Sequence, residues 1–150
     1  MARSEDIKSI IDLVRPVFHG LYRAAETKLR ARDISVPQRG MLQNLLEKGA
    51  QTVPSLARNL LVQRQFALRL ANELETMRLI ERKPNPAHKR SDRFQLSSAG
   101  ATLIAEVLSE EAAVSAWALA GVSDDDLRAT AHVLAALRSR FGAGGSDAAP

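Results

Sequence analysis

The chain has 150 residues, a length that fits one domain or one small domain with an added assembly element. It contains no cysteine, which excludes disulfides, thiolate metal sites and thiol redox switches. The net charge is +4 and the pI is near 10.0, while no apolar run approaches the roughly 18 residues of a membrane span. Since the N-terminus also lacks the apolar stretch of a signal peptide, we expect the protein to be cytoplasmic.

Residues 5–32 carry the pattern of a long amphipathic helix. The apolar side chains recur at steps of three and four residues, near a heptad repeat: Ile7, Ile11, Val14, Phe18, Leu21, Ala25 and Leu29. We expect part of this seam to pack against a second chain, and an ordinary amphipathic helix is the alternative. Pro16 lies inside the segment and is expected to kink or split the helix, because it lacks a backbone donor.

A second helix is expected from Ser35 to Gly49. Ser35 and Gln38 have the spacing of a capping box, in which each side chain satisfies the other's backbone amide. Gly49 suits a left-handed helix end. The expected buried face consists of Met41, Leu42, Leu45 and Leu46.

A pair of helices joined by a tight connection follows. The first runs from Pro54 to Leu60 after the cap Thr52, and the second from about Arg64 to Met77. The inward side chains of the second are expected to be Ala67, Leu70, Ala71, Leu74 and Met77. Its other face carries Arg64, Gln65 and Arg69, and Arg and Gln make paired hydrogen bonds with guanine and adenine in the major groove. Phe66 and Leu68 fit either a thymine methyl or packing on the preceding helix.

A strongly basic hairpin comes next, with strands expected at residues 79–83 and 93–96. The basic side chains of this region are Arg78, Arg82, Lys83, Lys89, Arg90 and Arg93, opposed by Glu81 and Asp92. Such clustering indicates an anionic partner, and a hairpin that is basic by chance is the alternative. An arginine at the tip suits a narrow minor groove.

Two closing helices are expected. Ser97 caps the first, which runs to about Leu119, and Ser123 caps the second. The acidic first turn of the second, Asp124–Asp126, is interpreted as a complement to the helix dipole rather than a metal site. The sequence has no glycine-rich phosphate loop and no nucleophile elbow, so we expect no enzyme, no cofactor and no metal.

These elements predict a mainly α protein with a winged helix-turn-helix in residues 35–97. Residues 1–34 and 98–142 are expected to form a helical dimerisation domain. Residues 143–150 are small and polar, and are expected to be disordered.

With these elements in order, the chain resembles the MarR family of bacterial transcription regulators. The most specific part is LETMRLIERKPNPAHKRSDRFQLSSAG, residues 74–100, and GVSDDDL before the last helix is also similar. The resemblance implies a homodimer with interleaved terminal helices, recognition helices in successive major grooves, and wings in the flanking minor grooves. It also implies control by a small, often aromatic or anionic ligand.

The resemblance carries over to single residues. Arg90 matches the wing arginine of the family, and Arg64 and Arg69 match positions in the recognition helix that meet DNA. His88 stands where the wing usually has an aspartate that orients the arginine, so that pairing is lost unless Asp92 replaces it. Gln65 and Phe66 stand where small hydroxyl residues are common, and the lack of cysteine excludes the thiol-based peroxide-sensing branch.

We therefore predict a ligand-responsive repressor that binds a pseudo-palindromic DNA operator as a homodimer. The alternative is a winged-helix protein-interaction module without sequence-specific DNA binding. The expected DNA contacts come from Arg58, Arg64, Gln65, Arg69, Lys89, Arg90 and Arg93. The candidates for an effector site are Arg15, His19 and Tyr22, beside Pro16, for which simple packing or exposure to solvent is the alternative.

Overall fold

The computed structural model describes residues 2–142, and the tail predicted to be disordered lies outside them. The elements are α1 (Ala2–Arg30), α2 (Val36–Lys48), β1 (Gln51–Thr52), α3 (Val53–Leu60), α4 (Arg64–Thr76), β2 (Ile80–Lys83), β3 (Arg93–Leu96), α5 (Ser98–Ala118) and α6 (Asp124–Phe141). The chain divides into two compact units, one reaching to Val107 and the other beginning at Leu108. The mainly helical winged-helix fold expected from the sequence is thus confirmed, whereas the domain boundaries stay a prediction.

Capping residues set most of the helix boundaries, as expected. The Ser35 hydroxyl accepts from the Gln38 amide at 3.3 Å, and the Gln38 side chain accepts from the Ser35 amide at 2.9 Å. At the starts of α3 and α6, the Thr52 and Ser123 hydroxyls accept from the Ser55 and Asp126 amides, without the reciprocal bond. Gly49 ends α2 with a positive φ of 75°, a conformation that glycine adopts at little cost.

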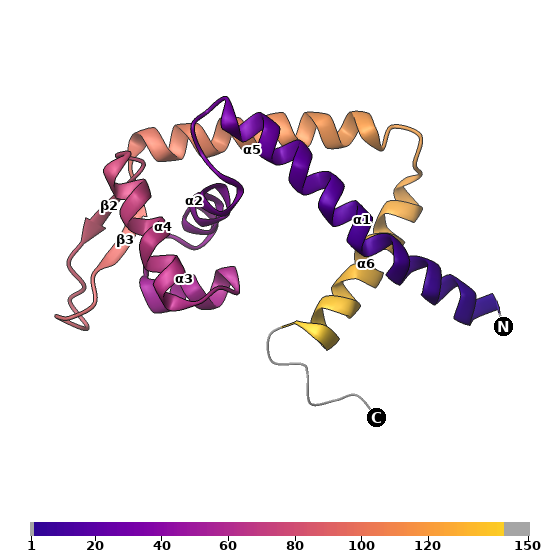
Figure 1. The fold of residues 1–150 in the computed structure, drawn as a ribbon, viewed down its shortest axis with the longest axis horizontal. Helices are drawn as coiled ribbons and strands as arrows, with labels where there is room; N and C mark the ends of the chain where they lie inside the picture. The colour runs from indigo at the N-terminus through magenta and orange to yellow at the C-terminus, as the bar shows by residue number, and fades with distance from the viewer. Residues whose placement is uncertain (1, 143–150) are drawn as a thin grey trace. The chain divides into compact units, whose positions relative to one another are not determined.

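The core of the first unit lies among α2, α3, α4, the sheet and the first part of α5 (Figure 1). Its largest fully buried side chains are Phe94, Met41, Leu42, Leu56, Leu74, Ile80 and Ile104. Small residues allow the helices to cross closely, since Ala57 of α3 and Ala67 and Ala71 of α4 are all buried. Burial of this face fixes which side of α4 points outward.

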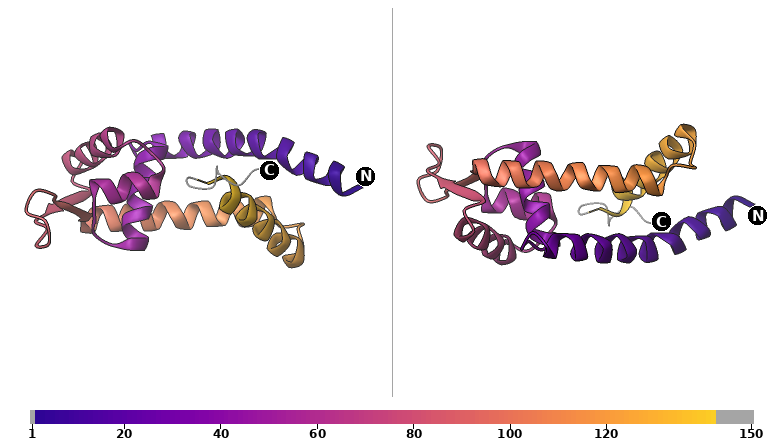
Figure 2. Two further views of the ribbon diagram at one scale, coloured as in Figure 1. Left: turned by 90° about the horizontal axis from the view of Figure 1, so that it is seen from below. Right: turned by 90° about the horizontal axis from the view of Figure 1, so that it is seen from above.

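The sheet is antiparallel, with β3 between β1 and β2. Ile80 pairs with Leu96, and Arg82 pairs with Phe94. The long connection between β2 and β3 projects beyond the helices as the wing (Figure 2). The two-residue strand β1 was not predicted, because Gln51 and Thr52 carry no alternating apolar pattern and form a strand only by pairing with β3.

Gly100 allows α5 to begin directly against the end of α4 and β2. The Ser97 hydroxyl accepts from the Gly100 amide at 3.0 Å, and a Cβ atom on Gly100 would collide with the Leu79 carbonyl oxygen. Only glycine fits this close approach. The two segments that frame the wing are therefore held together at its base.

Three details differ from the sequence-based expectation. Helix α1 is continuous through Pro16 and is not split. Leu46 is 43% exposed, because α2 buries Gln38, Met41, Leu42 and Leu45 and the next residue falls at the edge of that face. Met77 is also exposed, because it is the C-terminal cap of α4 and lies where the backbone leaves the helix.

The terminal helices expose much of their apolar surface. In α1 the exposed apolar side chains are Ile7, Ile11, Leu13, Val14, Val17, Phe18, Leu21 and Tyr22. In the second unit, Trp117 is 80% exposed, Phe141 is 78% exposed, and α6 buries none of its residues. Within residues 2–142, no helix combines the length and apolar character that crossing a membrane requires.

Candidate nucleic-acid interface

Helix α4 presents one polar, exposed face. Its buried residues Ala67, Leu70, Ala71 and Leu74 recur at helical spacing, so the remaining face points away from the core. The side chains on that exposed face are Arg64, Gln65, Leu68, Arg69 and Asn72. The packing of α3 against α4 therefore holds this set in a fixed orientation.

The start of α4 is open to an anion. Its N-cap, Gln63, makes no side-chain cap hydrogen bond, so the first backbone N–H groups have no capping side chain. These groups carry the positive end of the helix dipole, and Arg64 adds a full charge in the same turn. A helix N-terminus with an added positive charge is the kind of place at which proteins stabilise phosphate groups.

Arg64 and Arg90 line one hollow between α3, α4 and the wing. Its volume is about 170 Å³, and its lining residues are Val53, Pro54, Arg64, Leu68, Arg82, Arg90, Ser91, Asp92 and Phe94. Among residues 2–142, the side chains of Arg64 and Arg90 have no hydrogen-bond or ion-pair partner. Two arginines that are far apart in the sequence, and that were both predicted to contact DNA, thus line the same hollow. Their N–H donors are available to an external acceptor.

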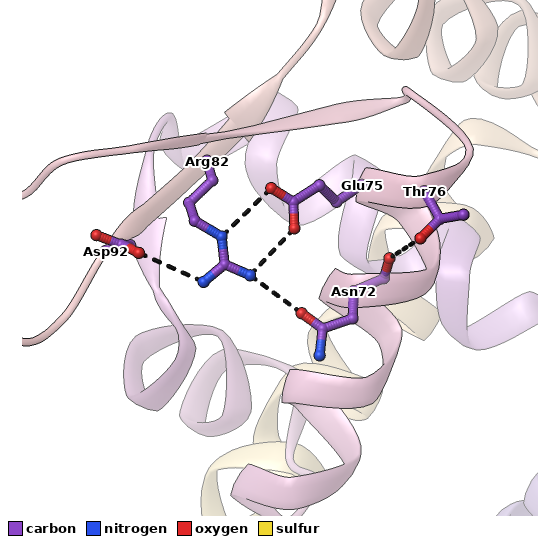
Figure 3. A network of polar contacts seen from close by, with 5 residues as sticks. All are labelled: Asn72, Glu75, Thr76, Arg82 and Asp92. Atoms are coloured by element: carbon purple, nitrogen blue, oxygen red, sulfur yellow. Dashed lines mark hydrogen bonds and ion pairs between the residues drawn. The ribbon is translucent and has the colours of Figure 1, made fainter.

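Arg82 ties the wing to α4 (Figure 3). Its guanidinium donates to both carboxylate oxygens of Glu75 at 3.3 and 3.0 Å, and to the Asn72 side-chain oxygen at 3.2 Å. It also donates to Asp92 at 3.3 Å and lies 4.8 Å from the centre of the Phe94 ring. The hydrogen bond to Glu75, with further contributions from Asp92, raises the pKa of Arg82 above its ordinary value. These contacts set where the wing begins.

Arg69 is held by its own helix and by α2. Its guanidinium lies 4.8 Å from the centre of the Phe66 ring, and its Nε is 3.7 Å from a Glu73 carboxylate oxygen. The other Glu73 oxygen accepts from the buried Gln38 amide at 2.9 Å. Phe66 therefore serves as a platform for Arg69, while Leu68 remains exposed on the outer face.

A family model and a solved structure that match this chain both come from the same protein family. A model of the MarR family matches residues 32–91, which contain α2, α3, α4 and β2. An uncharacterized protein of Mycobacterium tuberculosis is 35% identical over 107 residues, covering 70% of this chain and 74% of that protein. The crystal structure of a MarR family transcription regulator matches with a TM-score of 0.86 and 29% identity over 93% of both chains. The chain belongs to the MarR family.

Another solved relative in this family is S. aureus MepR in complex with DNA. It matches with a TM-score of 0.74 and 22% identity, covering 85% of this chain and 94% of that one. At this identity the likeness is one of fold. The MarR fold therefore accounts for the order of long helix, three-helix body, wing and closing helices.

The remaining residues predicted to contact DNA differ in whether their side chains have partners within the protein. Arg58 and Lys89 are exposed, on α3 and on the wing, and their side chains have no partner among residues 2–142. Gln65 lines an open groove of about 610 Å³ together with Arg69 and Asn72. Arg93 is exposed but donates to the Ala50 carbonyl at 2.9 Å, so it also joins β3 to the segment before β1.

The structure answers whether Asp92 replaces the missing wing aspartate of the MarR pattern. Asp92 pairs with Arg82, whose Nη1 lies 3.3 Å from its carboxylate, and not with Arg90. The Arg90 guanidinium therefore has no partner within residues 2–142. The sequence did not indicate that Arg82 links the wing to α4. Its partners Asn72 and Glu75 lie on α4, and only the turn between α4 and β2 brings them close to Arg82.

The three candidate effector residues lie along the exposed face of α1. Rings of Phe18 and His19 are 5.6 Å apart, and those of Phe18 and Tyr22 are 5.9 Å apart. Tyr22 lines a hollow of about 350 Å³ between α1 and the start of α2, which Arg15 and His19 do not line. No group of three or more metal-ligating side chains gathers anywhere in residues 2–142.

Replacing Arg82 tests the anchoring of the wing. Arg82→Lys keeps the charge but loses the planar fork, and one ammonium group cannot reach Glu75, Asn72 and Asp92 together. We expect faster hydrogen exchange across residues 84–92, measured by mass spectrometry. Since the Arg82 side chain is 41% exposed, unfolding free energy should fall by about 1 kcal/mol or less.

Lys83→Arg is the matched control for that experiment. It is the reverse exchange at the next position of β2, where the Lys83 ammonium has one ion-pair partner among the described residues, Glu81 at 3.5 Å. Its exchange pattern should equal that of the wild type. Unchanged exchange in Arg82→Lys would mean that the β2–β3 ladder alone holds the wing.

Proposed function

We propose that this MarR family protein is a DNA-binding transcription repressor that acts as a homodimer in the cytoplasm. The observation that carries the proposal is the hollow shared by Arg64 and Arg90, with α4 exposed beside it. Arginine recognises guanine edges in the major groove and fits narrow minor grooves, so one helix and one wing supply both kinds of contact. The proposal involves no chemical reaction.

The position of each side chain indicates whether it would contact base edges or phosphate groups. Arg64, Gln65 and Arg69 lie on the exposed face of α4 and would read base edges. Arg90 would enter the minor groove beside them, because the wing continues outward from the same hollow. Phosphate contacts from Arg58, Lys89 and Arg93 would supply affinity without sequence preference.

Selection of bound sequences from random duplexes tests the proposal. We expect a pseudo-palindrome whose half-sites lie about one helical turn apart. Repeating the selection with Arg64→Ala should remove the preference at one position of each half-site, a cost of about 1–3 kcal/mol. If random duplex is bound without any emerging preference, the protein-interaction alternative gains support and the repressor proposal fails.

The contribution of the wing is visible in the salt dependence of binding. Arg90→Ala should weaken binding to the selected duplex and lower the slope of log K against log salt by roughly one unit, as expected when one phosphate-like contact is lost. Arg128→Ala is the control, because it removes the same charge from α6, where Arg128 pairs with Asp125 at 2.7 Å. Equal slopes in both variants would remove the wing from the interface.

The exposed apolar faces of the terminal helices support the proposed homodimer. A single chain leaves Leu21 67% exposed and buries no residue of α6, surfaces that stable proteins usually cover with a partner. A second copy would cover them with faces of the same kind and would set the spacing of two winged helices.

A charge inside the apolar face of α1 tests this assembly. Leu21→Glu should reduce the particle mass measured by sedimentation to that of one chain, because an unpaired carboxylate would be buried at the interface. Thr27→Glu adds the same charge to α1 outside the apolar stripe and should leave the mass at two chains. A dimer that persists in Leu21→Glu would rule out this face of α1 as the contact.

Control by a small aromatic or anionic ligand completes the proposal. The hollow beside Tyr22 is also lined by Arg30 and by the carboxylates of Glu26 and Asp33. Tyr22 and Arg30 would be the partners of a phenolic acid in this hollow. Phenolic acids should release the bound duplex, with a change in Trp117 fluorescence, and Tyr22→Phe should raise the concentration required. If no phenolic acid affects either signal, this hollow has no role in regulation.

A further inference from the structure

Leu68 is the apolar exception on the exposed face of α4. The other leucines and alanines of the helix, at positions 67, 70, 71 and 74, are buried, whereas Leu68 is 37% exposed. It lines both hollows beside the helix, the one with Arg64 and Arg90 and the groove with Gln65, Arg69 and Asn72. Leu68 therefore lies at the centre of the surface assigned to base readout.

Phe66 does not share this position. Its ring lies under the Arg69 guanidinium at 4.8 Å, and the side chain is half-buried, so its contacts are made within the protein. Leu68 has neither a polar atom nor a ring that could support a neighbouring charge. Any specific contact that it makes with an external partner must therefore be apolar.

The major groove offers one apolar group that suits this side chain. Thymine presents its C5 methyl there, whereas the other base edges present hydrogen-bond donors and acceptors. A leucine against such polar edges would remove their water and return no hydrogen bond. The methyl group, in contrast, gains from losing water on contact with leucine.

We propose that Leu68 is a specificity-determining residue that recognises one thymine in each half-site through its C5 methyl group. This rests on the proposed function, because it requires α4 to enter the major groove. Gln65 and Asn72 lie one helical turn before and after Leu68 on the same face, so they would read the bases on either side.

Substitution of single methyl groups tests the proposal. In the selected duplex, each thymine is replaced in turn by deoxyuridine, which removes the C5 methyl and leaves all hydrogen-bonding groups in place. For the wild type, one replacement in each half-site should weaken binding about fourfold, the effect of one buried methyl group. Leu68→Ala should bind the thymine and deoxyuridine duplexes equally, and Leu68→Met should retain the difference.

Leu46→Ala is the matched control, since Leu46 is an exposed leucine of α2 on the same compact unit. It should show the wild-type response to every deoxyuridine. A flat response in the wild type, or a methyl effect that persists in Leu68→Ala, would overturn this inference and leave the proposed function intact. If selection yields no preferred duplex, both the proposed function and the inference fail.

Discussion

One guanidinium, that of Arg82, links the wing to α4. Arg82 spans two elements that are separate along the chain, because it binds Glu75 and Asn72 at the end of α4 while projecting from β2. Its further bond to Asp92 reaches the returning arm of the hairpin. Arginine suits this place because its planar group offers several donors in fixed directions. This link adds to the β2–β3 ladder in placing Arg90 at the hollow that Arg64 also lines.

The basic residues of this region divide into two groups. Arg82, Arg93 and Arg69 have partners within the protein, so their charge is used to position strands and side chains. The side chains of Arg64 and Arg90 have none among the described residues and line the hollow. A cluster of positive charge in a sequence therefore overstates the charge offered to a partner. The free arginines define the candidate interface more narrowly than the count of basic residues does.

Much of the fold was predictable because its signals are local. The capping box at Ser35, the caps at Thr52 and Ser123 and the apolar spacing of α4 each specify an element within a few residues. What the sequence did not indicate arises from contacts between distant residues. Strand β1 requires β3, the Arg82 contacts require α4 and β2 together, and the Gln38–Glu73 bond joins α2 to α4. Phe66 and Leu68 were undecided because both fit the same helical pattern, and only the place of Arg69 separates them.

The exposed surfaces of the protein differ in chemistry, and that difference indicates different partners. On the terminal helices the exposed apolar groups are mostly leucine, isoleucine, valine and phenylalanine, which gain by excluding water against a surface like their own. Around α4 the exposed groups include arginine, glutamine and asparagine, which can satisfy acceptors and donors on a polyanion. Leu68 is apolar, like many exposed side chains of the terminal helices, but it lies on the polar face of α4. An apolar side chain in the middle of a polar surface favours a partner that has an apolar group at the facing point, and thymine supplies such a group.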